Sequence, residues 1–187
     1  GWSRRSALTS LDVATGKMIA VPHAGIFSPD GRWGAVFADG QLSLLQIGSE
    51  TPRVLLKNCV ADPHMAFSPD SHWLLYTADD HSVHLKNIAA DKNIVDSPPA
   101  APEADEVGFA PDGRTAYAFS VDGSVHFWET STGNDRGRIA GADYYIEFFR
   151  FSPDGKSLLA ACSDCSTRIF DLETLKLVRL IESDDDH

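Results

Sequence analysis

Two cysteines, Cys162 and Cys165, stand first among the residues whose type and spacing could do chemistry. The spacing Cys-x-x-Cys occurs in redox centres and in zinc sites. A structural zinc ion needs about four ligands, and the remaining cysteine, Cys59, is too distant in the sequence to be assumed near. A redox pair usually opens a helix, whereas this pair is expected at a strand end and hairpin turn. We therefore expect ordinary reduced thiols.

The histidines and aspartates suggest metal binding, or a catalytic triad together with a serine, as alternatives. His84 and His126 recur at equivalent places of a repeated pattern, and such a position is normally explained by the repeat rather than by a site. The C-terminal stretch DDDH is expected to be a solvated tail. The chain has neither the Gly-x-Ser-x-Gly motif of hydrolases nor a glycine-rich phosphate loop. The sequence therefore predicts no catalytic residue, no metal site and no cofactor.

Composition narrows the class of protein. Of the 187 residues, 43% are hydrophobic and 23% are charged, as is usual for a globular chain. No run reaches the roughly 18 apolar residues of a membrane-spanning helix, and the first residues lack the apolar stretch of a secretory signal. A net charge of −11 repels phosphate backbones, which disfavours nucleic acid as a partner. No membrane partner is expected, and a cytoplasmic location is favoured.

A pentapeptide recurs through the chain. FSPDG begins at Phe27, and the copies FSPDS, FAPDG and FSPDG begin at Phe67, Phe109 and Phe151, at intervals of 40, 42 and 42 residues. Proline and glycine in the motif favour a tight turn, and Asp-Gly or a similar pair follows at the next turn. The short apolar runs between these turns predict four antiparallel strands per copy. We expect the four phenylalanines to be buried at the ends of the innermost strands.

A four-stranded unit of about 40 residues cannot bury both of its faces alone, so the units must stack face to face. This requirement predicts an all-β fold, a β-propeller of four-stranded antiparallel blades. The stretches DGSVHFWETSTG and SDCSTRIFDLET resemble the core of the WD-repeat family, which carries a tryptophan-aspartate pair at the places of Trp128-Glu129 and Phe170-Asp171. No copy has the glycine-histidine dipeptide of that family, so its buried histidine network is expected to be absent. The SPDG turn is also similar to that of propellers of the Tol system and the prolyl peptidases.

The segment before the first motif matches only the last two strands of a blade. We therefore expect a half blade, four blades and an acidic tail, with the boundaries 1–22, about 23–58, 59–98, 99–140, 141–182, and 183–187. An unfinished blade leaves an open edge and an uncovered apolar face. We expect the uncovered faces around Val36, Leu42, Leu158 and Ile169. Completing the ring needs upstream chain or a second chain.

In a propeller, the turns between second and third strands share one face with the connections between blades. Carboxylates gather in these segments, which predicts an acidic face that attracts cationic partners. The candidate partner-binding residues are Asp39, Asp62, Asp79, Asp80, Glu103, Asp105, Glu106, Asp122, Asp143, Tyr144 and Asp164. At least one of Tyr144 and Tyr145 is expected to pack inward, and turn aspartates also have a structural explanation.

The function predicted from these features is that of a non-catalytic scaffold. Its partner would be a protein or peptide with a basic segment, bound at the acidic loop face. The alternative is a regulatory or substrate-gating propeller domain of a larger multidomain enzyme.

Overall fold

The structure is a computed structural model that describes residues 8–11, 18–21, 24–49, 51–60, 63–97 and 104–182. All regular secondary structure in these residues is β-strand, and the described part of the chain contains no helix suited to crossing a membrane. A hairpin of β1 (Leu8–Leu11) and β2 (Met18–Val21) precedes four sheets of four antiparallel strands each. The rest of the expected half blade, the segment 98–103 and the acidic tail lie outside the described residues.

Each four-stranded sheet is one blade, numbered in chain order. Blade 1 consists of β3 (Ala24–Phe27), β4 (Trp33–Ala38), β5 (Gln41–Gln46) and β6 (Arg53–Leu56). Blade 2 consists of β7 (Met65–Phe67), β8 (Trp73–Thr77), β9 (Val83–Asn87) and β10 (Lys92–Ser97). Blade 3 consists of β11 (Ala104–Phe109), β12 (Thr115–Ser120), β13 (Val125–Glu129) and β14 (Asp135–Ile139). Blade 4 consists of β15 (Ile146–Phe151), β16 (Ser157–Cys162), β17 (Thr167–Asp171) and β18 (Lys176–Ile181).

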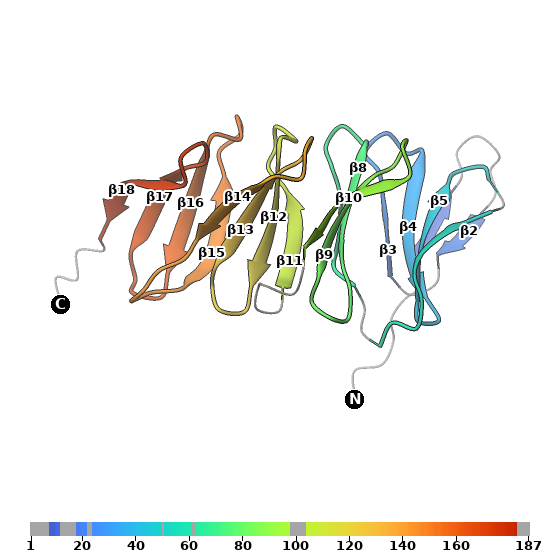
Figure 1. Cartoon of the computed structure of the whole chain (residues 1–187), viewed down its shortest axis with the longest axis horizontal. Helices are drawn as coiled ribbons and strands as arrows, with labels where there is room; N and C mark the ends of the chain where they lie inside the picture. The colour runs from blue at the N-terminus through green and yellow to red at the C-terminus, as the bar shows by residue number, and fades with distance from the viewer. Residues whose placement is uncertain are drawn as a thin grey trace.

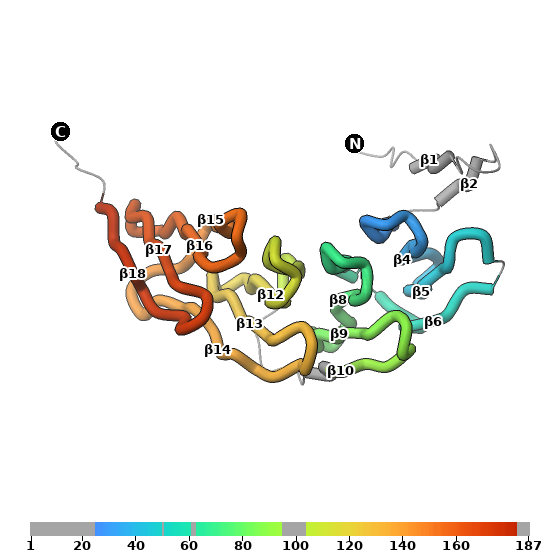
Figure 2. The backbone as a smooth tube through the Cα atoms, turned by 90° about the horizontal axis from the view of Figure 1, so that it is seen from above, coloured from blue at the N-terminus to red at the C-terminus, as the bar shows by residue number. Residues whose placement is uncertain are grey.

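The blades stand side by side and follow an arc. Within each blade the strands pair in chain order, which makes every sheet an antiparallel meander (Figure 1). Seen from above, the fourth strands β6, β10 and β14 lie on the outer side of the arc, and blades 1 and 4 lie towards its two ends (Figure 2). First strands of neighbouring blades contact one another, as β7 and β11 do. This is the blade arrangement of a β-propeller and confirms the predicted fold class, although the described blades do not close a ring.

The repeated pentapeptide builds the turn between the first and second strands. In blade 1 the Ser28 hydroxyl donates to Asp30 Oδ1 over 2.6 Å, and the Gly31 N–H donates to the Ser28 carbonyl over 2.9 Å. Gly31 has a φ of 70°, a value that glycine adopts without steric cost. Blades 2 and 4 repeat the serine–aspartate bond at 2.5 and 2.6 Å. The motif is therefore a self-bonded turn that fixes the first hairpin of a blade.

Motif turns of neighbouring blades also touch one another. The Asp30 N–H donates to the Ser71 hydroxyl of the next blade over 3.0 Å. A Cβ placed on Gly155 would lie only 2.7 Å from Cγ of Asp112 in the preceding blade. The last residue of the motif thus faces the motif of the blade before it. At Gly31, the last residue of the motif in blade 1, nothing lies within 4 Å of such a Cβ.

Hydrophobic clusters fill the junctions between blades. One cluster joins Leu44 of blade 1 to Leu74 of blade 2, and another joins Phe127 of blade 3 to Leu158 of blade 4. A third cluster lies between blades 2 and 3. Burial in this fold therefore arises between sheets, as the stacking argument requires.

The motif phenylalanines end the first strands of all four blades. The ring of Phe151 lies 5.1 Å from that of Tyr117 in the preceding blade, and Phe67 and Phe109 pack against the equivalent clusters. These three side chains are half-buried, whereas Phe27 is 45% exposed. The expectation that all four are buried is therefore wrong for Phe27, because no four-stranded blade precedes blade 1 in the described residues.

The uncovered faces at the ends of the arc differ from those expected. Leu42 and Leu158 are fully buried, because Leu42 faces blade 2 and Leu158 faces blade 3. Val36 and Ile169 are half-buried. Ile169 pairs with Leu159, which is 44% exposed on the free face of blade 4. Strand alternation identifies two faces in each strand, but only the fold shows which face meets a neighbour.

Candidate functional site

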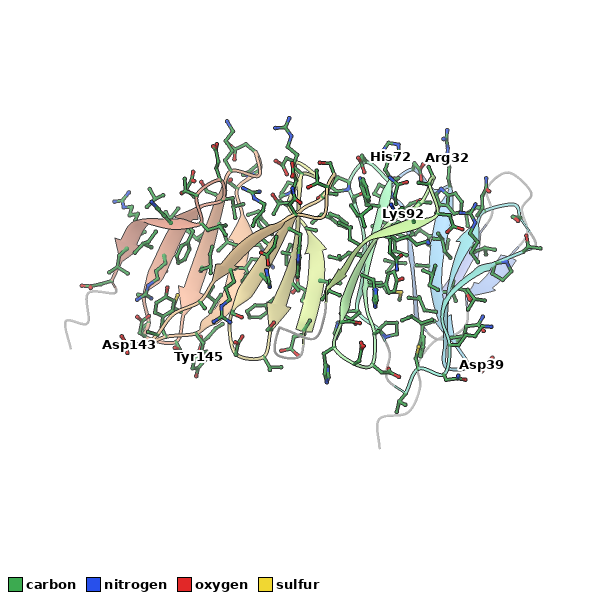
Figure 3. All side chains as sticks on the ribbon, viewed as in Figure 1. Arg32, Asp39, His72, Lys92, Asp143 and Tyr145 are labelled. Carbon is green, nitrogen blue, oxygen red and sulfur yellow. The ribbon has the colours of Figure 1, made fainter. Side chains whose placement is uncertain are left out.

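The turns between second and third strands and the connections between blades open on one face of the arc. We call it the connection face and define it by the described residues 39–40, 57–60, 63–64, 78–82, 104–106, 121–124, 140–145 and 163–166. Asp39, Asp143 and Tyr145 lie at this edge, and Arg32 and Lys92 lie at the opposite edge (Figure 3). The opposite face, which carries the motif turns, is called the hairpin face. Asp39 and Asp143, two of the residues predicted for the acidic face, therefore lie at the same edge of the molecule.

Three turns of the connection face have one geometry. The His81 N–H donates over 2.9 Å to the carbonyl three residues before it, and His81 has a φ of 63°. This is a type I turn followed by a left-handed residue. Gly123 and Cys165 hold the same place with φ values of 71° and 62°. In blade 1 the turn is shorter, and both Asp39 and Gly40 have positive φ, as in a type I′ hairpin.

An aspartate supports each of the three longer turns. Asp80, Asp122 and Asp164 each accept hydrogen bonds from the backbone N–H and from the hydroxyl of the serine two residues later. The carboxylate-to-hydroxyl distances are 2.5, 2.6 and 2.6 Å. An aspartate that bonds the backbone two residues on stabilises a turn. These three carboxylates are therefore part of the scaffold as well as of the surface charge.

The same hydrogen bonds favour the charged form of the carboxylates. Bonds from Ser82 hold the pKa of Asp80 below its ordinary value. The pKa of Asp164 is also lowered, first by the Arg168 guanidinium and then by the hydroxyl of Ser166. Arg168 Nη2 lies 2.7 Å from Asp164 Oδ2, which neutralises a basic residue at this face.

Two further predicted carboxylates also contact the protein. Oδ2 of Asp79 accepts the Val60 N–H over 2.7 Å and thereby ties the connection after blade 1 to a turn of blade 2. Oε1 of Glu106 accepts the Tyr117 hydroxyl over 2.7 Å. Burial, and then the Glu106 carboxylate, raise the pKa of Tyr117. Both acidic side chains hold the fold together.

Other carboxylates of the connection face remain available to a ligand. Within the described residues, Asp39, Asp105 and Asp143 are exposed and accept no hydrogen bond at the carboxylate. Asp62 and Glu103, which the sequence also suggested, lie outside the described residues. Three of the predicted positions thus present unpaired negative charge on one side of the molecule.

The adjacent tyrosines differ in their surroundings. Tyr144 is half-buried beneath Arg168, whose guanidinium carbon lies 3.6 Å from the ring centre, and it packs against the cluster between blades 3 and 4. Tyr145 is 56% exposed and rests on Gly123, where an added Cβ would come within 2.3 Å of the tyrosine Cβ. Val121, in the same turn as Gly123, is 59% exposed. The binding residues predicted from the sequence included Tyr144 but neither Tyr145 nor Val121. A valine inside an exposed turn was the sequence feature that could have indicated the exposed surface formed by Tyr145 and Val121.

The histidines on third strands make local structural contacts. The ring of His84 stacks on Tyr76 with the ring centres 5.0 Å apart. His126 stacks on Trp128 at 4.4 Å, and its Nε2 lies 3.0 Å from Oδ1 of Asp135. In the portion of the chain that the structure describes, no group of three or more histidine, cysteine, aspartate and glutamate side chains could hold a metal ion.

The cysteines are placed in different environments. Cys162 is buried in the cluster between blades 3 and 4, whereas Cys165 is exposed on a turn. Cys59 is half-buried, and its burial, followed by the nearby charge of Asp79, raises the pKa of its thiol. A raised pKa keeps that thiol protonated and weakly nucleophilic.

A groove of about 830 Å³ lies on the hairpin face. Its lining mixes Arg114 and Arg136 with Glu129 and Glu173. Nη2 of Arg136 donates to the Leu172 carbonyl of blade 4 over 2.5 Å, so this cation is already used to join two blades. The groove therefore presents no single sign of charge, in contrast to the connection face.

Known proteins support the repeat assignment. The WD40 family model (WD domain, G-beta repeat) matches residues 52–85 and 136–171, which confirms the predicted WD-repeat resemblance. Both matches run from the fourth strand of one blade to the third strand of the next, that is, from β6 to β9 and from β14 to β17. A sequence repeat therefore straddles a junction and links two adjacent blades.

A solved structure with a similar fold is hydrazine synthase of Kuenenia stuttgartiensis. The two chains are 20% identical with a TM-score of 0.58, and the match covers 82% of this chain and 47% of that one. At this identity the likeness shows the fold alone, and the present chain matches less than half the length of the other. No curated protein sequence matches the chain.

Proposed function

We propose that this WD-repeat β-propeller chain is a non-catalytic protein-interaction scaffold that binds a basic protein or peptide segment at its connection face. The WD40 repeat family is generally non-catalytic and suits such a role. The observation that carries the acidic-face assignment is that the carboxylates of Asp39, Asp105 and Asp143 are exposed without a hydrogen-bond partner in the described residues.

Charge and aromatic surface act together in this proposal. Carboxylates of one sign along a face attract a cationic partner before contact and speed its association. Lys57 belongs to the same face, but the chain as a whole carries a net charge of −11. The exposed ring of Tyr145 can stack with a lysine or arginine of the partner, an interaction worth about 0.5–1 kcal/mol at exposed sites. The ligand class is therefore a lysine- or arginine-rich peptide.

The test uses a fluorescently labelled peptide of alternating lysine and alanine residues, compared with the same peptide carrying glutamate for lysine. Binding to the protein should be measured by anisotropy and stopped flow at increasing salt. The triple variant Asp39→Asn, Asp105→Asn, Asp143→Asn should weaken binding about tenfold, mainly through slower association. Unlike those of Asp80 and Asp122, the carboxylates of these aspartates accept no turn hydrogen bond in the described residues, and asparagine also tolerates the positive φ of Asp39, so the fold should be unchanged.

A matched control separates the two faces. Glu173 is an exposed carboxylate on the hairpin face, and Glu173→Gln removes the same charge as Asp143→Asn. The proposal requires that Asp143→Asn slows association and that Glu173→Gln does not. Equal effects, or binding that does not weaken with salt, would show that the connection face is not the site.

One observation favours a second candidate function. The similar structure is named as an enzyme, which is compatible with a regulatory or substrate-gating propeller within a larger multidomain enzyme. The coding sequence adjoining this segment decides between the two: a catalytic domain there would support the second candidate.

A further inference from the structure

Two apolar side chains are exposed on the connection face where blades 3 and 4 meet. Tyr145, in the connection that enters blade 4, is 56% exposed, and Val121, in the turn between the second and third strands of blade 3, is 59% exposed. Tyr145 lies at the edge of this face (Figure 3) and packs on Gly123 of the same turn as Val121. Because the blades on both sides of this junction are present, the exposure of these side chains does not depend on the ends of the arc.

The backbone of Tyr145 is held by both blades. The Tyr145 N–H donates to the Ser163 hydroxyl over 3.1 Å, and the Ser163 N–H donates to the Tyr145 carbonyl over 3.0 Å. The next N–H along the chain, that of Ile146, donates to the Gly123 carbonyl over 3.0 Å. These bonds tie the connection to one turn of blade 3 and one turn of blade 4. An aromatic side chain on a backbone fixed in this way loses little conformational freedom when a ligand binds, which favours affinity.

Both residues depart from the repeat. Val121 lies twelve residues after the motif phenylalanine of its blade, and the other copies hold polar residues at this place, namely Asp39, Asp79 and Ser163. Tyr145 lies six residues before the motif phenylalanine of blade 4, where no other copy has an aromatic residue. A residue that recurs in every copy is explained by the repeat, and these two do not recur. Exposed apolar side chains at places that the other copies fill differently indicate a contact with another molecule.

The charge beside this apolar surface is negative. Asp143, two residues before Tyr145, is exposed and accepts no hydrogen bond at its carboxylate in the described residues. Arg168, which stacks on the adjacent Tyr144, is already paired with Asp164 over 2.7 Å. Like-signed charge around a contact selects a partner of opposite sign. An apolar side chain that binds here should therefore belong to a segment with basic neighbours.

We propose that Tyr145 and Val121 form an anchor site that takes one apolar side chain of the bound segment. The preferred ligand is then a lysine- or arginine-rich peptide that carries an apolar side chain, such as leucine, among its basic residues. This inference rests on the proposed function and adds a sequence requirement to it. The carboxylates attract any basic segment, and the anchor site selects among such segments. A fixed aromatic residue surrounded by weaker polar contacts is the usual arrangement of a binding hot spot.

The experiment compares two peptides on the full chain: the labelled lysine–alanine peptide and the same peptide with its central alanine replaced by leucine. Anisotropy titrations give the ratio of the two dissociation constants for each protein. The wild type should bind the leucine peptide about tenfold more tightly. Val121→Ser and Tyr145→Ala should each lower this ratio below about threefold. Both side chains are exposed, and circular dichroism will show that the fold is retained.

Val60→Ser is the matched control for Val121→Ser. Val60 is 94% exposed on the connection face but belongs to the connection between blades 1 and 2, so this variant should keep the ratio of the wild type. The ratio also cancels any contact of Tyr145 with a lysine, because both peptides contain the same lysines.

The outcomes separate the anchor site from the proposed function. Equal affinities of the two peptides for the wild type would overturn the anchor site and leave the acidic face as proposed. A ratio that persists in Val121→Ser and Tyr145→Ala, or that falls equally in Val60→Ser, would also overturn it. A leucine preference that is lost in Val121→Ser but not in Val60→Ser supports the anchor site even if the aspartate triple variant binds as the wild type does, and then only the role of the acidic charges fails. If neither peptide binds, both proposals fail.

Discussion

The residue that ends the first strand is the point at which each blade meets the one before it. Phe151 lies between two blades, whereas Phe27 has the same place in the repeat with one side uncovered. Replacing Phe151 by alanine should cost about 3 kcal/mol, because the change leaves a cavity at a junction. Replacing Phe27 by alanine should cost less than about 1 kcal/mol, as at other exposed positions. Urea unfolding of the two variants measures the difference.

This pair of variants is its own control, since the same atoms are removed from the same repeat position. Equal losses of stability would mean that Phe27 is covered in solution. If both variants were as stable as the wild type, the phenylalanine would not be a packing residue and the junction assignment would fail.

The carboxylate of Asp164 makes the stability of blade 4 depend on pH. Its pKa is lowered in the folded state, so its contribution to stability is complete above the ordinary value and is lost as the pH falls through the folded-state value. Asp164→Asn should therefore be less stable than the wild type at neutral pH. The difference in free energy of unfolding between the two proteins should become smaller as the pH falls from about 4 to about 2. Thermal unfolding at a series of pH values checks this. Asp143→Asn, which breaks no hydrogen bond in the described residues, is the matched control for the loss of one carboxylate.

Single residues show where sequence reasoning reaches its limit. The fourfold motif predicted the place of each phenylalanine, because the period is nearly constant. It did not predict which of Leu42, Leu158 and Leu159 is exposed, because alternation distinguishes two faces without identifying the neighbour of each. Likewise the sequence did not show which of Tyr144 and Tyr145 packs inward, since the stacking of Arg168 on Tyr144 depends on the position of another strand.

At the scale of the element, the motif turn joins blades as well as strands. Gly155 and Gly31 have nearly equal φ values of 68° and 70°, but only Gly155 meets a neighbour, at 2.7 Å from Asp112 Cγ. Gly31→Ala should cost about 1 kcal/mol from the left-handed backbone alone. Gly155→Ala should cost about 1 kcal/mol more, because Asp112 must move. Chemical denaturation of both variants measures the difference, and equal costs would show that the contact between turns adds nothing.

Turns were also the elements that the sequence predicted best. Asp-Gly and similar pairs indicated the second turn in every blade, and the hydrogen bonds from the following serine explain why Asp80, Asp122 and Asp164 stand there. These hydrogen bonds separate the predicted acidic residues into carboxylates that the protein already binds and carboxylates that remain available to a ligand. A list of acidic turn residues contains no information on which carboxylates are already bound by the protein, so Asp39, Asp105 and Asp143 emerged as the available ones only from the structure.

At the scale of the whole molecule, the blades differ in how much of their surface is covered. Blades 2 and 3 are covered on both faces, whereas every residue of β18 in blade 4 is exposed. In a repeat protein each unit is stabilised by its neighbours, so a unit with one neighbour opens at lower free energy. Amide hydrogens of β17 and β18 should therefore exchange faster than those of β13 in blade 3. Mass spectrometry of peptides after exchange measures this difference. Equal exchange rates in all four blades would mean that the arc unfolds as one cooperative unit in which the missing cover has no energetic effect.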